Sequence, residues 1–402
     1  MKTTDRSVNW KGFLLPMLII AIMFSILGFA VGINAFFVPF VKSAFQINTA
    51  TSYLVTTATF SAFVIFGIPS GKILIKAGYK RSMFLSFLLM ALGMLLIISA
   101  AKWISFPIFL FALFVNGMGQ TLLNTAINPY ITILGAENSA AKRISIMGIC
   151  NKLSFGLAPV VLAIFMDTAN VQLNNVIVPF YVITGILVLL GVLSYFAPLP
   201  EVRASGEDEE ISDHANSRIS ILQYPHLILG ALAIFFYVGV ENIALVSIND
   251  YAIELGLSSP ETFAAYVSAG YILGYLLGII LIPKIVSQTD AMKFNATLGI
   301  LLSLLIVLLP ERTSIYFVAT LGLANSLLWP AIWPLALADL GKFTKRGSSF
   351  LVMGIAGGGL LPPLLGLFKD YFSAYQQAYW MLLPIYLYFL FFATKGYKIR
   401  KV

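Results

Sequence analysis

The sequence predicts an all-α membrane protein with twelve transmembrane helices. Of its 402 residues, 59% are hydrophobic and only 10% are charged, and the mean hydropathy is +0.91. Soluble domains carry about 25% charged residues, so the polar side chains here are too few to cover a water-facing surface. In lipid, backbone polar groups must be satisfied within the protein, by helices or by a closed barrel. Apolar stretches of about 20 residues favour helices, because barrel strands are only about ten residues long.

Twelve apolar stretches follow one another along the chain, with short polar segments between them. A helix rises about 1.5 Å per residue, so roughly 20 residues cross a hydrocarbon core about 30 Å thick. We expect one transmembrane helix in each of the ranges 12–40, 49–75, 82–101, 106–134, 143–166, 176–198, 226–249, 259–283, 291–310, 314–338, 347–368 and 375–394.

Basic residues gather on one side of the predicted bundle. If the N-terminus is cytoplasmic and the spans alternate in direction, most of the 25 Lys and Arg residues fall in cytoplasmic segments. Cytoplasmic loops of membrane proteins carry such an excess, and one helix more or fewer would move every later loop to the other side. We therefore expect both termini in the cytoplasm. The net charge of +8 reflects this asymmetry and contact with lipid headgroups, so we expect no nucleic-acid partner.

A polar, acidic stretch divides the chain into two halves. Residues 207–210 are all acidic, and they lie between the sixth and seventh predicted spans. Such a charged run is typical of a solvated linker. We expect a six-helix bundle over 1–198, a cytoplasmic linker over 199–225 and a second six-helix bundle over 226–402.

Short motifs recur in the two halves at an offset close to half the chain length. The pairs are Leu134-Gly135 with Leu340-Gly341, Lys142-Arg143 with Lys345-Arg346, Met147-Gly148 with Met353-Gly354, and Pro159 with Pro362. Duplicated bundles of this kind are related by an axis along the membrane normal. Because two such bundles can rock around a cavity between them, the repeat predicts a transporter, which we expect to work as a monomer.

Glycine and proline gather in the eleventh predicted span, where Gly357, Gly358 and Gly359 precede Pro362. Small residues let helices approach closely, and proline removes a backbone hydrogen bond. We expect this segment to flex as a gate. Lys80 and Arg81, in the loop after the second span, are the other predicted gating residues.

Several motifs resemble one family of transporters. Residues 71–81 read GKILIKAGYKR, which resembles the signature loop of the major facilitator superfamily. The fourth span contains NTAINPY over 124–130, and GSS stands at 347–349. Together these motifs resemble the fucose–galactose–glucose:proton symporter family of that superfamily. The resemblance extends over all twelve spans.

This resemblance implies import of a monosaccharide, such as glucose, galactose or fucose, across the bacterial inner membrane by a multi-pass protein. In the family, an acidic residue in the first span and another in the fourth serve proton coupling. Here the corresponding positions are Ala35 and Asn124, and neither side chain can titrate. A proton or a sodium ion therefore stays open as the coupling ion.

Two ionisable residues, Lys152 and Glu241, fall well inside predicted spans. A charge at this depth costs about 2.5–3.5 kcal/mol on insertion scales, so each is a candidate functional residue. We expect Glu241 to bind sugar hydroxyls or to titrate during transport, with Lys152 as its partner. A stabilising ion pair without a role in transport is the alternative.

Amide and aromatic side chains complete the predicted sugar site. Amides both donate and accept hydrogen bonds, as sugar hydroxyls require, and a flat ring can stack on the C–H face of a hexose. Asn124 and Asn128 lie four residues apart, on one helical face. The predicted sugar-binding residues are Asn34, Asn124, Asn128, Asn151, Glu241, Asn242 and Trp329.

Other functions are weighed against sugar import. A drug or metabolite antiporter of the same superfamily and an uncoupled sugar facilitator are the alternatives. Apart from His226, at the very start of the seventh span, the spans contain no histidine, and they contain no metal-ligand cluster and no Ser/His/Asp set, so we expect neither an enzyme nor a cofactor. The single cysteine, Cys150, excludes a disulfide within the chain.

Overall fold

The structure is a computed structural model, and it describes residues 10–47, 49–52, 54–165, 177–204 and 221–400. Within these ranges all regular structure is helical, which confirms the predicted fold class. Eleven of the described helices are long and apolar enough to cross a membrane.

Helices of the first half of the chain pack mainly on one another. The most extensive contacts join α4 to α5 and α7, and α1 to α6. These elements are α1 (Trp10–Ala44), α2 (Thr49–Ser52), α3 (Leu54–Ile65), α4 (Gly67–Lys102), α5 (Phe106–Ile133), α6 (Ala140–Phe165) and α7 (Ile177–Phe196).

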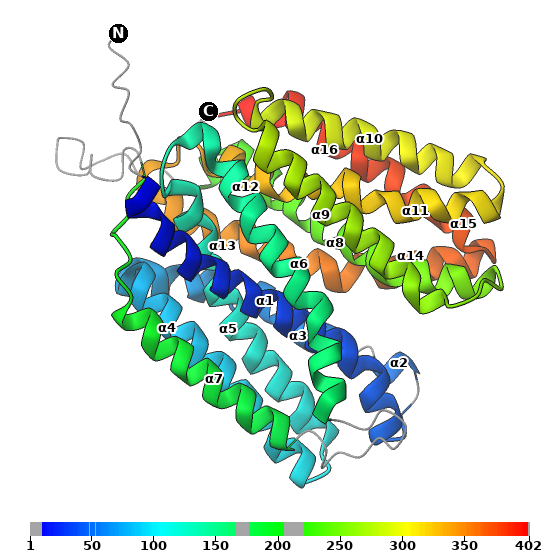
Figure 1. Cartoon of the computed structure of the whole chain (residues 1–402), viewed down its shortest axis with the longest axis horizontal. Helices are drawn as coiled ribbons and strands as arrows, with labels where there is room; N and C mark the ends of the chain where they lie inside the picture. Colours follow the sequence, from blue (N-terminus) through cyan, green and yellow to red (C-terminus); the bar gives the residue numbers. More distant parts are fainter. Residues whose placement is uncertain (1–9, 48, 53, 166–176, 205–220, 401–402) are drawn as a thin grey trace.

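Helices of the second half form another group, in which α9 packs on α11, α10 on α16, and α8 on α14. Figure 1 shows the two groups side by side. The elements of the second group are α8 (Pro225–Glu254), α9 (Phe263–Leu281), α10 (Gln288–Leu308), α11 (Glu311–Ser326), α12 (Leu328–Leu337), α13 (Thr344–Met353), α14 (Gly357–Phe372), α15 (Tyr375–Ala378) and α16 (Leu382–Thr394). Short 3₁₀ turns join several of them, including η7 (Gly354–Ala356) and η8 (Tyr379–Met381).

The predicted second and third spans account for the difference between twelve expected and eleven observed helices. The second span is divided at Phe66 into α3 and the start of α4, and α3 alone is too short to cross a membrane. The rest of α4 is the third span, joined to the second through Gly78 (φ 75°, ψ 175°). Only glycine adopts this conformation without strain, so Gly78 makes the reversal between the two spans.

Two predicted spans of the second half are interrupted in mid-course. The tenth is divided into α11 and α12 at Leu327 (φ −94°, ψ 1°), just before Pro330, whose nitrogen cannot donate a helical hydrogen bond. The eleventh is divided into α13 and α14 by η7. A 3₁₀ stretch within a helix often marks a hinge, which suits the predicted gate.

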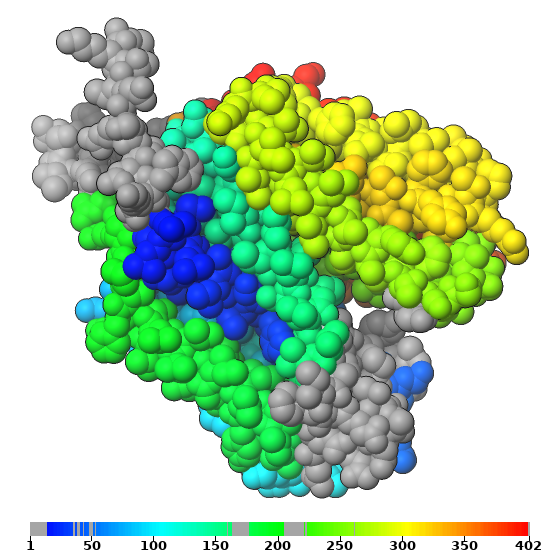
Figure 2. All heavy atoms as spheres, viewed as in Figure 1, coloured from blue at the N-terminus to red at the C-terminus, as the bar shows by residue number. Residues whose placement is uncertain are grey.

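The two halves meet most closely at one end of the helices. There α6 lies against α9, as Figures 1 and 2 show, and α13 lies against α4 and α5. Ser348 Oγ donates a buried hydrogen bond of 2.6 Å to the Thr125 carbonyl oxygen of the other half. The Ser349 hydroxyl packs on Gly71, where an added Cβ would lie 2.6 Å from Ser349 Oγ. Small residues thus allow the halves to touch here.

The predicted linker falls largely on residues 205–220, which lie outside the described residues. The proposed domain boundaries therefore stay a prediction.

Candidate ligand cavity between the two halves

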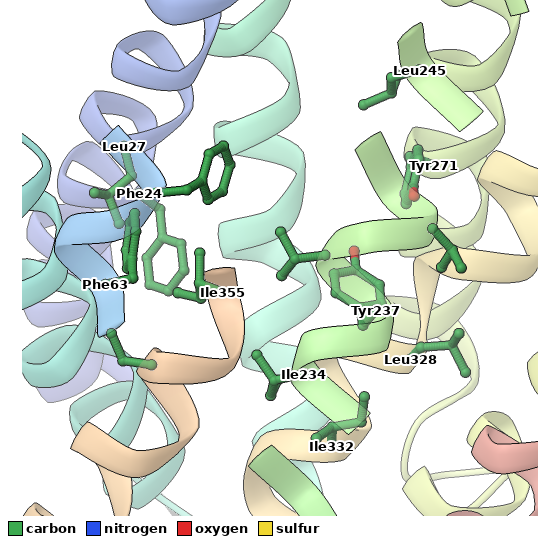
Figure 3. Close-up of a cluster of buried hydrophobic side chains, with 14 of the residues drawn as sticks. Phe24, Leu27, Phe63, Ile234, Tyr237, Leu245, Tyr271, Leu328, Ile332 and Ile355 are labelled. Atoms are coloured by element: carbon green, nitrogen blue, oxygen red, sulfur yellow. The ribbon is translucent and has the colours of Figure 1, made fainter. Parts of the chain in front are cut away.

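A cavity of about 110 Å³ lies between the two groups of helices. This volume has room for several water molecules or part of a small ligand. Its walls come from α1, α3, α5 and α6 of the first half and from α8, α9, α12 and η7 of the second. Phe24 and Leu27 of α1 and Phe63 of α3 lie opposite Ile355 of η7 and form an apolar part of the wall (Figure 3).

One ion pair crosses the cavity from half to half. Lys152 Nζ on α6 lies 2.5 Å from Glu241 Oε1 on α8, and the two side chains are 7% and 16% exposed. The pairing that was a hypothesis from the sequence is therefore present. The Tyr237 hydroxyl, one turn before Glu241 on α8, donates a hydrogen bond of 2.9 Å to the same oxygen.

The backbone fixes the orientation of two cavity amides. Asn151 Nδ2 donates to the Phe24 carbonyl (3.1 Å) and so links α6 to α1. Asn242 Nδ2 donates to the Val238 carbonyl (2.8 Å) on its own helix. Because a backbone carbonyl only accepts, each amide must turn its NH₂ group to the backbone. This leaves Oδ1 of each to accept from another donor.

The amides of α5 form a ladder along one helix face. Asn124 Nδ2 donates to the Gln120 carbonyl (3.0 Å), and Asn128 Nδ2 donates to Asn124 Oδ1 (3.1 Å). Gln120 Nε2 donates in turn to Asn116 Oδ1 (2.7 Å). Gln120 and Asn124 line the cavity, as does Asn34 of α1.

Asn128 does not reach the cavity. It is fully buried one turn further along α5 than Asn124, and its Oδ1 atom has no partner among the described residues. A shared helical face gives two residues the same direction but not the same depth, because four residues advance about 6 Å along the axis. The structure therefore places Asn128 as a support for Asn124 and does not support the predicted sugar contact.

Aromatic rings surround the ion pair. The Trp329 ring lines the cavity and lies 5.5 Å, centroid to centroid, from both Tyr237 and Trp333. Trp333 is fully buried and lies behind Trp329, outside the lining. Tyr275 of α9 also lines the cavity, and its ring packs on Gly148 of α6, where an added Cβ would lie 2.6 Å from Tyr275 Cζ.

The predicted gating residues lie in two separate places. Gly358 and Gly359 pack against Phe60 of α3, and a Cβ on Gly358 would lie 2.7 Å from Phe60 Cε1. Gly357 packs on the Phe235 carbonyl of α8, and Pro362 lies within α14. Lys80 and Arg81 lie just after the Gly78 reversal, away from the cavity, and Arg81 is exposed.

Sequence reasoning missed some of the lining. Tyr275 and Phe155 lie among many aromatic residues of similar spacing, and only the packing of α6 on α9 brings them to the cavity. Gln120 lies four residues before Asn124 on the same helical face of α5, and this spacing is the signal that could have pointed to it.

These features define the class of protein: a multi-pass membrane protein with a partly polar cavity between its two halves. The family model of the Major Facilitator Superfamily matches residues 18–361, and the chain belongs to this superfamily.

Known relatives agree with this assignment. The chain is 32% identical to a protein of Brucella abortus named glucose/galactose transporter, over 99% of this chain and 97% of that protein. It is 26% identical to a protein of Escherichia coli named L-fucose-proton symporter, over 90% of this chain and 88% of that protein. A crystal structure of the transporter FucP in the outward conformation matches with a TM-score of 0.82 at 22% identity, over 96% of this chain and 99% of that one.

Proposed function

We propose that this chain imports a neutral monosaccharide, such as glucose, galactose or fucose, in symport with protons across the bacterial inner membrane. The observation that carries the proposal is the cavity that both halves line with amides, aromatic rings and one neutralised ion pair. Relatives named glucose/galactose transporter and L-fucose-proton symporter support the substrate class and the coupling ion.

The chemistry of the cavity suits an uncharged polyol. Asn151 and Asn242 offer carbonyl oxygens to sugar hydroxyls, and their fixed NH₂ groups hold these oxygens in place. Lys152 and Glu241 neutralise each other, so no unpaired cation is left for an acidic sugar. Trp329 supplies a ring for the C–H face of a hexose.

Import proceeds in this proposal by alternating access of two six-helix bundles with both termini in the cytoplasm. The contacts of α13 with α4 and α5 then close the cytoplasmic end, which corresponds to an outward-facing state. The similarity to FucP in its outward conformation supports this orientation of the closed end.

Glu241 is the proposed proton carrier. Ala35 and Asn124 cannot titrate, whereas Glu241 lies in the cavity beside Lys152. Protonation of Glu241 from the outer side removes the attraction that joins α6 to α8 and frees the halves to rearrange. No cofactor takes part in this mechanism, and the protein is a carrier rather than an enzyme.

An uncoupled facilitator is the second candidate, and the ion pair itself favours it. If the Lys152–Glu241 pair stayed closed, both residues would remain charged through the whole cycle, and no proton would be carried. Sugar would then move only down its own gradient.

Uptake of labelled hexoses into proteoliposomes with imposed proton or sodium gradients separates these functions. We expect accumulation of a neutral hexose against its gradient when the outside is acidic, and loss of accumulation with a protonophore. Equilibration without accumulation would identify the facilitator. A requirement for sodium would identify sodium, instead of the proton, as the coupling ion. Transport of hydrophobic drugs without hexose uptake would contradict sugar import.

A further inference from the structure

The Lys152 ammonium contacts a ring in addition to Glu241. Its Nζ lies 4.9 Å from the centroid of the Tyr271 ring on α9 and 5.9 Å from that of Phe155 on its own helix. Lys152 belongs to the first half, whereas Glu241 and Tyr271 belong to the second. The ammonium is thus placed between a carboxylate and the face of a buried ring.

Tyr271 is held rigidly in this position. Its side chain is fully buried. The backbone of α9 packs closely on α11, because Gly322 touches the Val267 carbonyl and Gly274 touches the Ser326 hydroxyl. With such packing the ring cannot follow Lys152 or withdraw from it, so it acts as a fixed platform.

This platform matters when Glu241 carries a proton. The carboxyl is then neutral, and the ammonium would be left without a counter-charge inside the membrane, where an unpaired charge is costly. The face of an aromatic ring attracts a cation, most strongly when both are shielded from water. Tyr271 supplies this second attraction, whereas a leucine in its place would not.

We propose that Tyr271 is a positioning residue that holds the Lys152 ammonium while Glu241 is protonated, and so sets the pH at which Glu241 takes up its proton. This inference rests on the proposed proton coupling and names a residue that tunes it.

Other titratable groups near Glu241 do not change charge in this process. Besides Lys152 from α6, the groups that face Glu241 are Tyr237 on its own helix and Tyr271 and Tyr275 on α9, and Tyr386 of α16 faces Tyr271. Phenols stay neutral over the pH range in which a carboxyl titrates. The lining residues of α12 and η7, Trp329 and Ile355, do not titrate.

Infrared difference spectroscopy on the purified protein in lipid nanodiscs tests this role directly. The band of the protonated Glu241 carboxyl is assigned by its loss in Glu241→Gln, and its intensity is followed against pH without any sugar. In Tyr271→Leu we expect the midpoint to fall by about one pH unit, because the protonated state has lost the ring. Tyr271→Phe, which keeps the ring, should titrate as the wild type does.

Tyr266→Leu is the matched control, because it makes the same change on the same helix at a residue that is 58% exposed. If Tyr271→Leu does not fold, Tyr271→Met fills the space with a flexible side chain and is expected to show the same acid shift. An unchanged midpoint in the folded variant, or an equal shift in Tyr271→Phe, would overturn the inference.

The proposed function is judged by a separate measurement. If the wild type accumulates no hexose while the band midpoint responds to Tyr271→Leu, symport fails and the placement of the ammonium by Tyr271 stands. If hexose uptake is proton-driven and the band midpoint is the same in Tyr271→Leu as in the wild type, symport stands and the inference fails.

Discussion

At the scale of single residues, the cavity depends on charges and amides that satisfy one another. Lys152 and Glu241 neutralise each other, and Tyr237 donates a further hydrogen bond to the carboxylate. Asn151 and Asn242 are anchored through their NH₂ groups. The cavity therefore has a defined polar surface before any ligand enters.

Removal of one member of the ion pair should harm the protein more than removal of both. Lys152→Met leaves a buried carboxylate without its partner, and breaking a buried pair in this way costs about 3–5 kcal/mol. We expect the double variant Lys152→Met, Glu241→Leu to unfold at a higher temperature than Lys152→Met alone. Thermal unfolding in detergent measures this, and simple additivity of the two single losses would contradict the pairing.

Trp329 should contribute to sugar affinity through its ring. In Trp329→Ala we expect the KM for hexose uptake to rise about fivefold, since ring contacts of this kind contribute roughly 1 kcal/mol beyond burial. Trp329→Phe should lose about twofold. Trp380→Ala is the control, because Trp380 is partly exposed on η8, away from the cavity. Equal losses in Trp329→Ala and Trp380→Ala would argue against sugar stacking.

Much of the site could be predicted from residue type alone. Lys152 and Glu241 stand out because ionisable groups are rare at this depth, and Asn34, Asn124, Asn151, Asn242 and Trp329 were found in the same way and all line the cavity. Asn128 does not line the cavity, because a shared helical face does not give depth. Tyr271 was not singled out, since a cation–ring contact depends on how α6 packs on α9.

At the scale of elements, the helices are interrupted where the halves must approach or reverse. Gly78 allows the tight reversal within α4, and η7 separates α13 from α14. Beside η7, Gly358 and Gly359 leave space for Phe60 of α3. The second half can thus approach the first at mid-course only because these positions lack side chains.

A methyl group at Gly358 should obstruct this approach. In Gly358→Ala the new Cβ would lie 2.7 Å from both Phe60 Cε1 and Asn242 Nδ2, closer than atoms pack. We expect the maximal uptake rate to fall at least tenfold, and Phe60→Leu to restore part of it. Gly366→Ala on the same helix is the control, because an added Cβ there meets nothing within 4 Å. Normal transport by Gly358→Ala would show that α14 does not need this contact.

The positions of the helices could largely be predicted from the sequence, whereas the positions of the breaks within them could not. Apolar stretches of the right length give the spans, because lipid enforces that length. The division at Phe66 coincides with Gly67 and Pro69, because a proline nitrogen cannot donate a helical hydrogen bond to the Ile65 carbonyl, but we did not predict a break there. Pro330 is consistent with an interruption of the tenth span, whereas the position of the break at Leu327 depends on the packing of α11 and α12.

At the scale of the whole molecule, the halves are joined at the end where α13 meets α4 and α5, in addition to the contacts of α6 with α9 and of α3 with α14. Ser348 joins the Thr125 backbone there, and Ser349 rests on Gly71. These two serine contacts are small and uncharged, and beside them the Lys345 ammonium of α13 lies 5.5 Å from the centroid of the Tyr79 ring of α4.

A large side chain at Gly71 should keep this end apart. We expect Gly71→Leu to shift spin-label distances across the α4–α13 contact outward and to lower hexose uptake severalfold, because Ser349 occupies the space of the new side chain. Gly185→Leu on α7, where an added Cβ has open space, should leave both unchanged. Wild-type distances in Gly71→Leu would show that the contact does not hold this end closed.

If Glu241 carries the coupled proton as proposed, the bridge between Lys152 and Glu241 also determines how the carrier responds to voltage. With both groups ionised their charges sum to zero, so reorientation of the empty cavity moves no net charge across the bilayer. Once Glu241 holds a proton, one positive charge remains on Lys152, and each 100 mV of inside-negative membrane potential favours its inward movement by about 2.3 kcal/mol. The electrical gradient then drives the loaded step alone, and the return of the empty carrier is electrically silent.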